Sequence, residues 1–412
     1  MLHEMWRAAI RAAQPATCLP GHWPEPPAGR LAVIACGKAA RPMAAAAAER
    51  YGAGFEGLVI EPADPGAVLE SIPGFRHIGS SHPVPDERSV AAASAALQLA
   101  AGLAPDDLLL VLLSGGGSAL MSLPAAGLSL EKKQSLTRQL LASGATIHEI
   151  NCVRKKLSRI KGGRLALACR ARVVTLAISD VPGNDPRLIA SGPTVWDRNT
   201  SDDARDILTR HGIRLTAAID RVLHGAAAES PGHFDPTAQN TYQIVASGMT
   251  ALQAAGDCCR RNGVEPLILG DDLQGEAREL AREQARMALD LARKGNTCCL
   301  LSGGETTVTP GVSPGRGGRN TEYALALALA LGGRPGIWAL AADTDGIDGC
   351  EGHSGALVDP DTLQRAARAG LEAENYLRRH DTAGFFEQIG GLLVEGPTGT
   401  NVSDFRAILV NP

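Results

Sequence analysis

Short apolar runs alternate with longer alanine-rich or amphipathic segments through the first half of the chain. The apolar runs at 31–36, 108–113 and 173–178 predict strands that are buried on both faces, as in a parallel sheet. The segments at 39–50 and 89–102 have the composition and period of helices. This alternation predicts a doubly wound α/β sheet.

The second half of the chain shows the same alternation after a stretch rich in Gly, Pro and Asp. Strands are expected at 242–246, 297–301 and 337–341, and helices at 249–262, 275–295 and 321–331. The tail at 391–409 can hold two more strands. A chain of 412 residues is too long for one typical core. We therefore expect two α/β domains, at 1–236 and 237–412.

Composition narrows the class of protein. Only 3% of the residues are aromatic and the formal net charge is −4, which argues against partners such as nucleic acid or an anionic membrane. The nine cysteines include no Cys-x-x-Cys pair, so we expect reduced thiols rather than disulfides or zinc ligands. The sequence shows no signal peptide and no membrane-spanning run. We expect a cytoplasmic protein.

The most informative segment follows the strand at 108–113. This strand passes directly into the loop Ser114, Gly115, Gly116, Gly117 and Ser118. Glycines let the backbone approach a ligand closely, the serines add hydroxyl groups, and a helix behind the loop would present free N–H groups to an anion. A similar loop, Ser302-Gly303-Gly304-Glu305-Thr306, follows the strand at 297–301. The recurrence predicts two α/β units that face one cleft.

Lys38 lies where the first predicted strand passes into a helix, which is a usual position for a phosphate-binding lysine. The segment is not a Walker A loop, because Ala32 replaces the first glycine and Ala39 replaces the magnesium-binding Ser or Thr. The plain alternative is a surface lysine at a helix start. The position at the end of a strand favours a functional lysine.

A strongly basic segment runs from Asn151 to Arg164. We place it on a helix, where Lys156, Arg159 and Gly163 would share one face and Lys155 another. Such a run is usually a solvated face, so most of these charges are expected to lie in solvent. The position between two strands leaves room for one cation that points inward.

Two aspartates follow the strand at 173–178. Asp180 and Asp185 lie at the carboxyl end of a parallel strand, where α/β sheets bind ligands. Either could hold magnesium or accept a proton from a hydroxyl group. The alternative is a Pro-Gly turn in which Asp acts only as a cap.

A glycine-rich loop in the second half carries two arginines, Arg316 and Arg319. The planar guanidinium fork suits phosphate, and Asn320 or Thr321 can cap the helix that follows. The alternative is a flexible surface loop. Farther along, Asp343, Asp345 and Asp348 follow another strand; this loop lacks the last glutamate of an EF-hand, since Ser354 stands there. A magnesium- or phosphate-organising loop is the better interpretation.

Taken together, these segments resemble the class II glycerate 2-kinases, whose C-terminal half is the MOFRL domain. The matching pieces occur in the family's order: Gly37-Lys38-Ala39-Ala40, Ser114 to Ser118, His148 to Asn151 with Arg154-Lys155, Ser179 to Asp185, Ser191 to Thr194, Ser302 to Glu305, Gly317 to Asn320, Asp343 to Asp348 and Thr398 to Asn401. They span nearly the whole chain. No single piece is specific, but the ordered set is.

The resemblance implies phosphorylation of D-glycerate to 2-phosphoglycerate with ATP and Mg²⁺. It also implies a Rossmann-like N-terminal domain and a MOFRL-type C-terminal domain with the active site in the cleft between them. The implied catalytic residues are Lys38, Arg319 and Asp180. The implied ligand-binding residues are Ser114, Gly115, Gly116, Gly117, Ser118, Asn184, Gly303, Gly304, Glu305, Asn320 and Asn401, with Asp185, Asp343 and Asp345 as metal ligands.

Two alternatives stay open beside the kinase. Relatives of this family often carry the name hydroxypyruvate reductase, but an NAD(P)H enzyme would need Gly-x-Gly-x-x-Gly, which the serine–glycine loop fails at Leu120. A non-enzymatic sugar-phosphate sensor could use the same anion loops, but it would not need three clustered aspartates. The expected partners are D-glycerate and ATP, and the sequence leaves a homo-oligomer open. We expect alanine at Lys38 or Arg319 to lower turnover and hardly affect folding.

Overall fold

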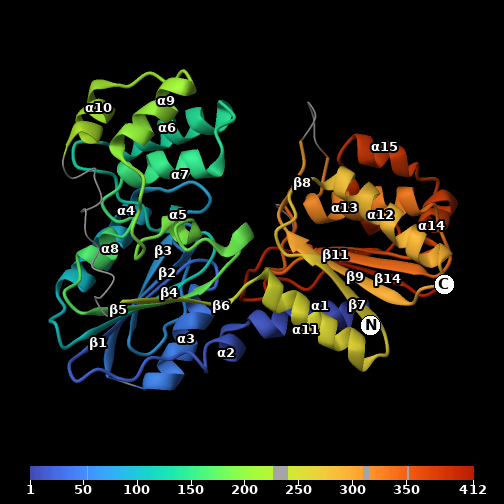
Figure 1. Ribbon diagram of the computed structural model, residues 1–412, viewed down its shortest axis with the longest axis horizontal. Coiled ribbons are helices and arrows are strands. Elements are labelled where there is room, and N and C mark those ends of the chain that lie inside the picture. Colours follow the sequence, from blue (N-terminus) through green and yellow to red (C-terminus); the bar gives the residue numbers. More distant parts are fainter. Residues whose placement is uncertain (53, 226–239, 310–314, 350–351) are drawn as a thin grey trace. The chain divides into compact units, whose positions relative to one another are not determined.

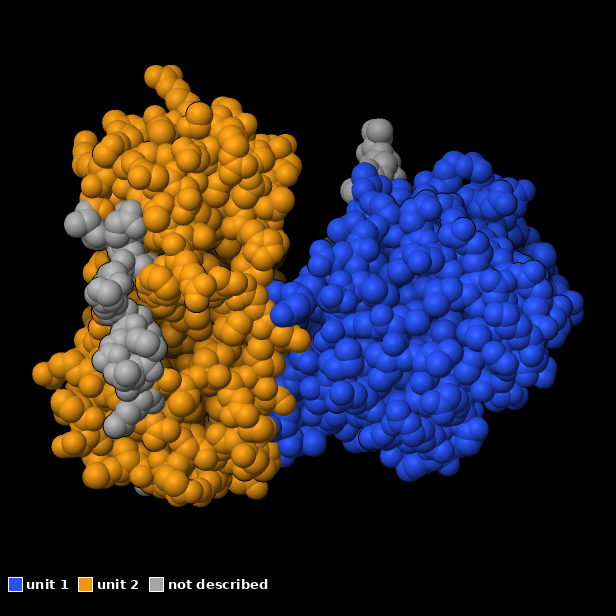
Figure 2. Space-filling view, viewed as in Figure 1, with its two compact units in different colours: residues 1–18, 180–183, 246–412 blue, residues 19–179, 184–245 orange. Residues whose placement is uncertain are grey.

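The computed structural model describes residues 1–52, 54–225, 240–309, 315–349 and 352–412. The chain forms two compact units, which Figure 2 shows in different colours. Unit 1 comprises Met1–Cys18, Asp180–Gly183 and Ala246–Pro412, and unit 2 comprises Leu19–Ser179 and Asn184–Val245. Each unit is an α/β structure, which confirms the predicted fold class.

Unit 2 is built on a six-stranded sheet with the order β3-β2-β1-β4-β5-β6. The strands are β1 (Leu31–Cys36), β2 (Phe55–Pro62), β3 (Phe75–Ser80), β4 (Leu108–Leu113), β5 (Arg172–Ile178) and β6 (Thr241–Ala246). The four pairings among β1 to β5 are parallel. This is the strand order of Rossmann sheets, in which the chain direction across the sheet reverses between β1 and β4. Ligands bind at such a reversal, beyond the carboxyl ends of the strands.

The burial of β1 and β4 agrees with their apolar sequences. Every residue of both strands is buried, because helices cover the sheet. The helices of unit 2 are α3 (Ala40–Tyr51), α4 (Glu87–Ala101), α5 (Gly117–Leu120), α6 (Leu130–Ala142), α7 (Ile147–Lys156), α8 (Arg164–Leu167), α9 (Ser201–Arg210) and α10 (Ala217–His224). A 3₁₀ turn at Ile189–Ser191 also belongs to unit 2, and another at Pro182–Asn184 lies where the chain passes from unit 1 to unit 2. Figure 1 shows that α6, α7, α9 and α10 gather beyond the sheet, where they share a second apolar core.

Unit 1 contains a mixed sheet with the order β13-β12-β11-β14-β9-β7. Its strands are β7 (Glu265–Gly270), β9 (Cys298–Gly304), β11 (Ile337–Asp343), β12 (Gly355–Val358), β13 (Leu392–Leu393) and β14 (Asp404–Val410), with β8 (Gly275–Glu276) and β10 (Thr306–Thr307) paired separately. Among the described residues, β7 and β9 pair parallel, whereas β14 pairs antiparallel with both β11 and β9. The predicted tail strands are therefore present, and the last one is central.

Helices cover both faces of the sheet in unit 1. They are α1 (Leu2–Ala13), α2 (Pro15–Cys18), α11 (Gly248–Arg261), α12 (Ala277–Arg293), α13 (Arg319–Leu331), α14 (Thr362–Arg368), α15 (Ala373–Arg378) and α16 (Thr382–Gln388). Figure 1 shows α12 and α13 on one face and α1 with α11 on the other. The alanine stripe of α12 packs in one core cluster with the buried residues of α13.

The first helix differs from the expected division of the chain. Met5 and Trp6 of α1 are fully buried, and the Met5 sulfur lies 3.6 Å from the Cys259 sulfur of α11. Because its apolar face packs on α11, the N-terminal helix belongs to unit 1. The expected boundary between 236 and 237 lies outside the described residues, so the domains 1–236 and 237–412 stay a prediction.

Several local predictions differ from the structure. Phe75–Ser80, which was not among the expected strands, forms strand β3 at the edge of the sheet. The basic helix ends at Lys156, so Arg159 and Gly163 do not share a helix face with it. Among the described residues, no helix combines the length and apolar character that crossing a membrane requires.

Candidate functional site

Two loops meet at the point where the strand order of unit 2 reverses. β1 ends at Cys36 and its neighbour β4 at Leu113, so both exits lie at the same edge of the sheet. The backbone N–H of Lys38 donates to the carbonyl of Gly115 over 2.8 Å, and the N–H of Ala39 donates to the Ser114 hydroxyl over 2.9 Å. The predicted lysine and the predicted serine–glycine loop therefore form one structure.

Two glycines make this close approach possible. Gly37 has φ 134°, and a Cβ there would lie 2.2 Å from the Ser114 hydroxyl oxygen. Gly116 has φ 83°, and a Cβ there would lie 3.0 Å from the His82 ring and 3.5 Å from the Lys38 side chain. Both conformations favour glycine. His82, which the sequence analysis did not select, is thus a neighbour of the loop.

The Ser118 hydroxyl is the centre of a polar network. It lies 2.7 Å from the Ser191 hydroxyl, which donates to the Asn151 side chain over 3.1 Å. Ala190 and Ser191 both have positive φ, 51° and 60°, although neither is a glycine. Such strained residues are characteristic of functional sites, where the surrounding structure holds them in place.

Asp180 and Asn401 are 221 positions apart in the chain but adjacent in unit 1. The Asn401 amide donates to the Asp180 carboxylate over 3.2 Å, and the Ser403 hydroxyl donates to the Asp180 carbonyl over 2.7 Å. Ser403 has φ 69°, again a positive value for a residue with a side chain. Two residues selected from separate motifs are therefore in direct contact.

Asn184 and Asp185 lie in unit 2, in the segment that follows Gly183. Asp185 forms a two-point ion pair with Arg187, with a shortest distance of 2.7 Å. The hydrogen bond from this side chain lowers the pKa of Asp185 below its usual range. The carboxylate is engaged by a cation of its own loop, and its role as a metal ligand stays a prediction.

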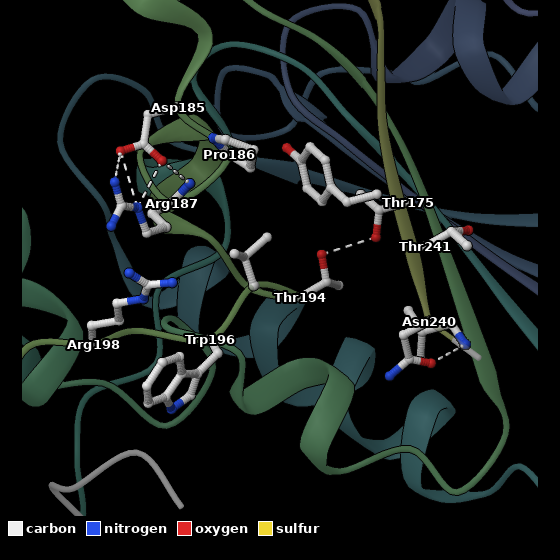
Figure 3. A pocket seen from close by; sticks show the side chains of 12 residues that line it. Thr175, Asp185, Pro186, Arg187, Thr194, Trp196, Arg198, Asn240 and Thr241 are labelled. Carbon is white, nitrogen blue, oxygen red and sulfur yellow. Dashed lines mark hydrogen bonds and ion pairs between the residues drawn. The ribbon is translucent and has the colours of Figure 1, made fainter. Parts of the chain in front are cut away.

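A cavity of about 510 Å³ adjoins this ion pair, a size within the range of small-molecule sites. Figure 3 shows the Asp185–Arg187 pair beside it, together with Trp196, Arg198 and the hydrogen bond between Thr175 and Thr194. Its lining includes neither the Lys38 segment nor the serine–glycine loop. Its size alone therefore assigns it no role.

Arg319 is the centre of the candidate site in unit 1. It is the first residue of α13, and its guanidinium donates to Asp343 over 2.5 Å and to Asp404 over 2.7 Å. The sheet sets this geometry, because Asp343 ends β11 directly opposite Asp404, which begins β14. Burial opposes the charge of Arg319, but Asp404, Asp343 and Glu305 together raise its pKa above the usual value.

The start of α13 is held by a further carboxylate, Asp348. It accepts hydrogen bonds from the backbone N–H groups of Asn320 and Thr321, each over 2.9 Å. The Asn320 side chain donates to Asp404 over 2.8 Å. Asp348 and Asp404 were not among the predicted site residues, although the sequence analysis had noted Asp348 in its acidic loop.

The predicted loop of Gly303, Gly304 and Glu305 adjoins this cluster. Gly304 lies opposite Asp404 across the strand pair, and a Cβ on Gly304 would lie 2.3 Å from the Leu273 carbonyl oxygen. These glycines therefore have a packing role, and ligand binding by them stays a prediction. The Glu305 carboxylate lies 3.8 Å from the Arg319 guanidinium.

Acidic side chains outnumber cations around Arg319. Desolvation, followed by repulsion from Asp345 and Asp404, raises the pKa of Asp343 well above its usual range, and Arg319 opposes this shift. Within the described ranges, no group of three or more His, Cys, Asp or Glu side chains is placed to hold a metal ion by itself. The roles of Asp343 and Asp345 as metal ligands stay a prediction.

A cavity of about 300 Å³ opens beside Arg319. Its lining includes Gly317 and Gly318 of the glycine-rich loop, and also Glu322 and His380. The His380 ring lies 3.0 Å from the Glu322 carboxylate, which also pairs with Arg278. Arg319 thus presents one edge to a small cavity while buried carboxylates hold the other.

The fold defines a two-unit α/β protein with a Rossmann-type sheet, whose serine–glycine loop lies at the reversal of strand order. A family model described as a domain of unknown function (DUF4147) matches residues 1–224, and the MOFRL family model matches residues 298–404. Together these two matches include both sets of candidate residues.

Solved and curated relatives identify the family. The crystal structure of a glycerate kinase from Thermotoga maritima superposes with a TM-score of 0.91 at 36% identity, covering 99% of this chain and 98% of that chain. A glycerate 2-kinase from Pyrococcus horikoshii is 36% identical over 93% of this chain and 88% of its own length. A protein from Agrobacterium vitis named putative hydroxypyruvate reductase is 46% identical over 100% of this chain and 94% of its own length. The chain belongs to the glycerate kinase family.

Proposed function

We propose that this protein is a glycerate 2-kinase, which transfers the terminal phosphoryl group of ATP to the 2-hydroxyl group of D-glycerate. The observation that carries the proposal is the joining of the Lys38 segment to the serine–glycine loop where the strand order of unit 2 reverses. Two relatives named as glycerate 2-kinases match most of the chain, at 36% and 37% identity.

Phosphoryl transfer needs positioning and charge neutralisation more than covalent chemistry. In unit 2, the exposed Lys38 residue beside Gly116 would provide a point charge for a phosphate or substrate oxygen. The glycine backbone of the loop allows a phosphate to approach closely. Lys38 would thus neutralise charge that develops during transfer.

In unit 1, Arg319 supplies a guanidinium that is already oriented. Asp343 and Asp404 hold one side of it, so it would lose little freedom when a phosphate binds. Asp343 and Asp345 would hold Mg²⁺, which when bound would offset the negative charge of the phosphates. Asp180, held by Asn401, would accept the proton of the substrate hydroxyl group.

The reductase alternative is less well supported by the residues. In a Rossmann dinucleotide site, an acidic residue about twenty positions after the glycine motif binds the ribose hydroxyl. The acidic residue near the carboxyl end of β2 is Glu61, and both of its oxygens accept hydrogen bonds from Arg41 over 2.9 Å. His77 also lies 3.1 Å from one of them. That carboxylate is already occupied within the fold.

We expect the purified protein to form 2-phosphoglycerate from ATP, Mg²⁺ and D-glycerate. The measurement is product identification by NMR or by an enolase-coupled assay, which separates phosphorylation of the 2-hydroxyl from that of the 3-hydroxyl. The control is the same mixture with L-glycerate.

Exclusive formation of 3-phosphoglycerate would contradict the assigned position of transfer. NADH with hydroxypyruvate is expected to give no turnover, because the dinucleotide fingerprint is absent. Steady NADH oxidation by the pure protein that is lost in Lys38→Ala would show that the reductase alternative is correct.

Metal removal gives a second expected result. The excess of carboxylates around Arg319 predicts a hard cation that is held partly by phosphate oxygens, so EDTA should abolish turnover. Mg²⁺ added in excess should restore it, and Ca²⁺ should restore it poorly because of its larger, less rigid coordination. Undiminished turnover after exhaustive chelation would show that no such cation takes part.

A further inference from the structure

Two cationic side chains converge on the Ser118 hydroxyl. The Arg154 guanidinium and the Lys161 ammonium each donate to its oxygen over 2.9 Å, and Lys161 also donates to the Ser118 carbonyl over 2.6 Å. Because this oxygen accepts from two cations, its own proton is directed to Ser191. Two cationic side chains therefore contact the last residue of the serine–glycine loop.

A third cation, Lys133 of α6, lies in the same region. Only 5% of this residue is exposed, and its ammonium group has no hydrogen-bond partner among the described residues. An unpaired buried ammonium group is costly. The charges that act on it most are those of Arg154 and Arg164, which repel it.

Asp197, a carboxylate of this region, pairs with two other lysines. Asp197 lies 3.4 Å from the Lys155 ammonium and 3.7 Å from that of Lys156. Within the part of the chain that the structure describes, neither Lys133, Arg154 nor Lys161 forms an ion pair with a carboxylate. These three side chains therefore have no carboxylate counterion among the described residues.

The pKa shifts agree with this geometry. Desolvation, reinforced by Arg154 and Arg164, lowers the pKa of Lys133 to about 7. Desolvation and the neighbouring cations lower the pKa of Lys161 well below its usual value. Charges placed so close together without a counterion indicate that an anion belongs among them.

The cluster is also open to a ligand on one side. Gly116, Ser118 and Arg154 are partly exposed, whereas Lys133 and Lys161 are buried behind them. An anion that reaches the serine–glycine loop would meet the hydroxyl and the guanidinium first. The buried ammonium groups would then attract the anion strongly, because little water lies between the charges to screen them.

We propose that Lys133, Arg154, Lys161 and Ser118 form a binding site for a small oxyanion, the carboxylate or a phosphoryl group of one of the reactants. The proposal rests on the proposed kinase function for the identity of those reactants. Arg154 offers a planar fork to two oxygens, and Lys133 gains the partner that it lacks in the described structure. The Ser191–Asn151 pair keeps the Ser118 oxygen directed toward the cations.

The test is direct binding without turnover. Calorimetry measures the affinity of the full chain for D-glycerate alone, for ADP alone and for inorganic phosphate. Arg154→Gln is expected to lower the affinity for either D-glycerate or ADP by about tenfold or more, the loss expected when a charge-assisted hydrogen bond is removed. The matched control is Arg159→Gln, which removes an exposed arginine of the same basic run and should change no affinity by more than about twofold.

The two sources of the oxyanion are separated by which affinity falls. Weaker D-glycerate binding with unchanged ADP binding identifies a carboxylate site, and the reverse identifies a phosphoryl site. Both outcomes support the proposal. Failure of the kinase assay alongside phosphate binding that depends on Arg154 would contradict the proposed function but not this site.

Lys133→Met distinguishes a ligand-binding cation from a structural one. Removing an unpaired buried charge should leave the thermal midpoint unchanged or raise it, while affinity for the same reactant falls. A lower midpoint with unchanged affinity would give Lys133 a structural role and overturn the proposal. Unchanged affinities in folded Arg154→Gln would overturn it as well.

Discussion

Arg319→Ala is expected to lower kcat by about a hundredfold or more, comparable to the loss of one preorganised electrostatic stabiliser. The structure also predicts a loss of stability in this variant. Asp343 and Asp404 are almost fully buried, and both lose a cationic partner in this variant. Breaking a buried ion pair costs roughly 3–5 kcal/mol, so the thermal midpoint should fall too. The prediction that folding hardly changes is therefore revised for Arg319.

Arg319→Lys and Arg316→Ala separate the two effects. The lysine keeps a charge near the carboxylates, so most of the stability should return, but it cannot reproduce the planar fork and kcat should stay low. Arg316 is on the same glycine-rich loop, forms an exposed ion pair with Glu387, and serves as the matched control. Near-normal kcat in a folded Arg319→Lys would show that only the charge, and not the guanidinium geometry, is used. Near-normal kcat in Arg319→Ala would remove this residue from the mechanism.

Lys38→Ala is expected to lower kcat by about a hundredfold or more with little change in the thermal midpoint. The Lys38 residue is exposed, and its contact with Gly115 uses the backbone N–H, which alanine retains. The backbone contact that joins the two loops should therefore remain in the variant. The measurements are kcat, the affinity for each reactant and the midpoint.

Lys132→Ala provides the control for Lys38, since Lys132 is an exposed lysine on α6 outside the candidate sites. Its kcat and midpoint should match those of the unmodified protein. If Lys38→Ala retained near-normal kcat, Lys38 would be a surface charge at a helix start, the alternative that the sequence had left open. A large fall in midpoint would instead indicate that the joined loops depend on its side chain.

The strands of unit 2 and the loops that follow them could be predicted because they depend on short stretches of sequence. Six consecutive apolar residues at Leu108–Leu113 are stable only where both faces are covered, which already implies a central strand of an α/β sheet. The glycines that follow allow conformations that few other residues adopt. That Lys38 and Ser114 begin adjacent loops follows once β1 and β4 are neighbours in the sheet.

The basic run shows where local reasoning failed. A periodic run of lysines and arginines usually lies in solvent, and a single inward cation was expected. The helix ends at Lys156, and Lys155, Lys156 and, beyond the helix, Lys161 are all buried. Their burial depends on Asp197 and Ser118, whose positions no helical period predicts.

The Arg319 cluster depends on tertiary structure for a similar reason. The sequence by itself determined which segments are strands, where glycine is needed, and that arginine and aspartate occur at the ends of elements. It could not show that the last strand lies between β9 and β11, because strand order depends on long-range pairing. That pairing places Asp404 opposite Asp343 and gives Arg319 two buried partners. The sequence gives the charge of each residue. The electrostatic free energy of that charge depends on its neighbours and on the exclusion of solvent, which only the folded structure supplies.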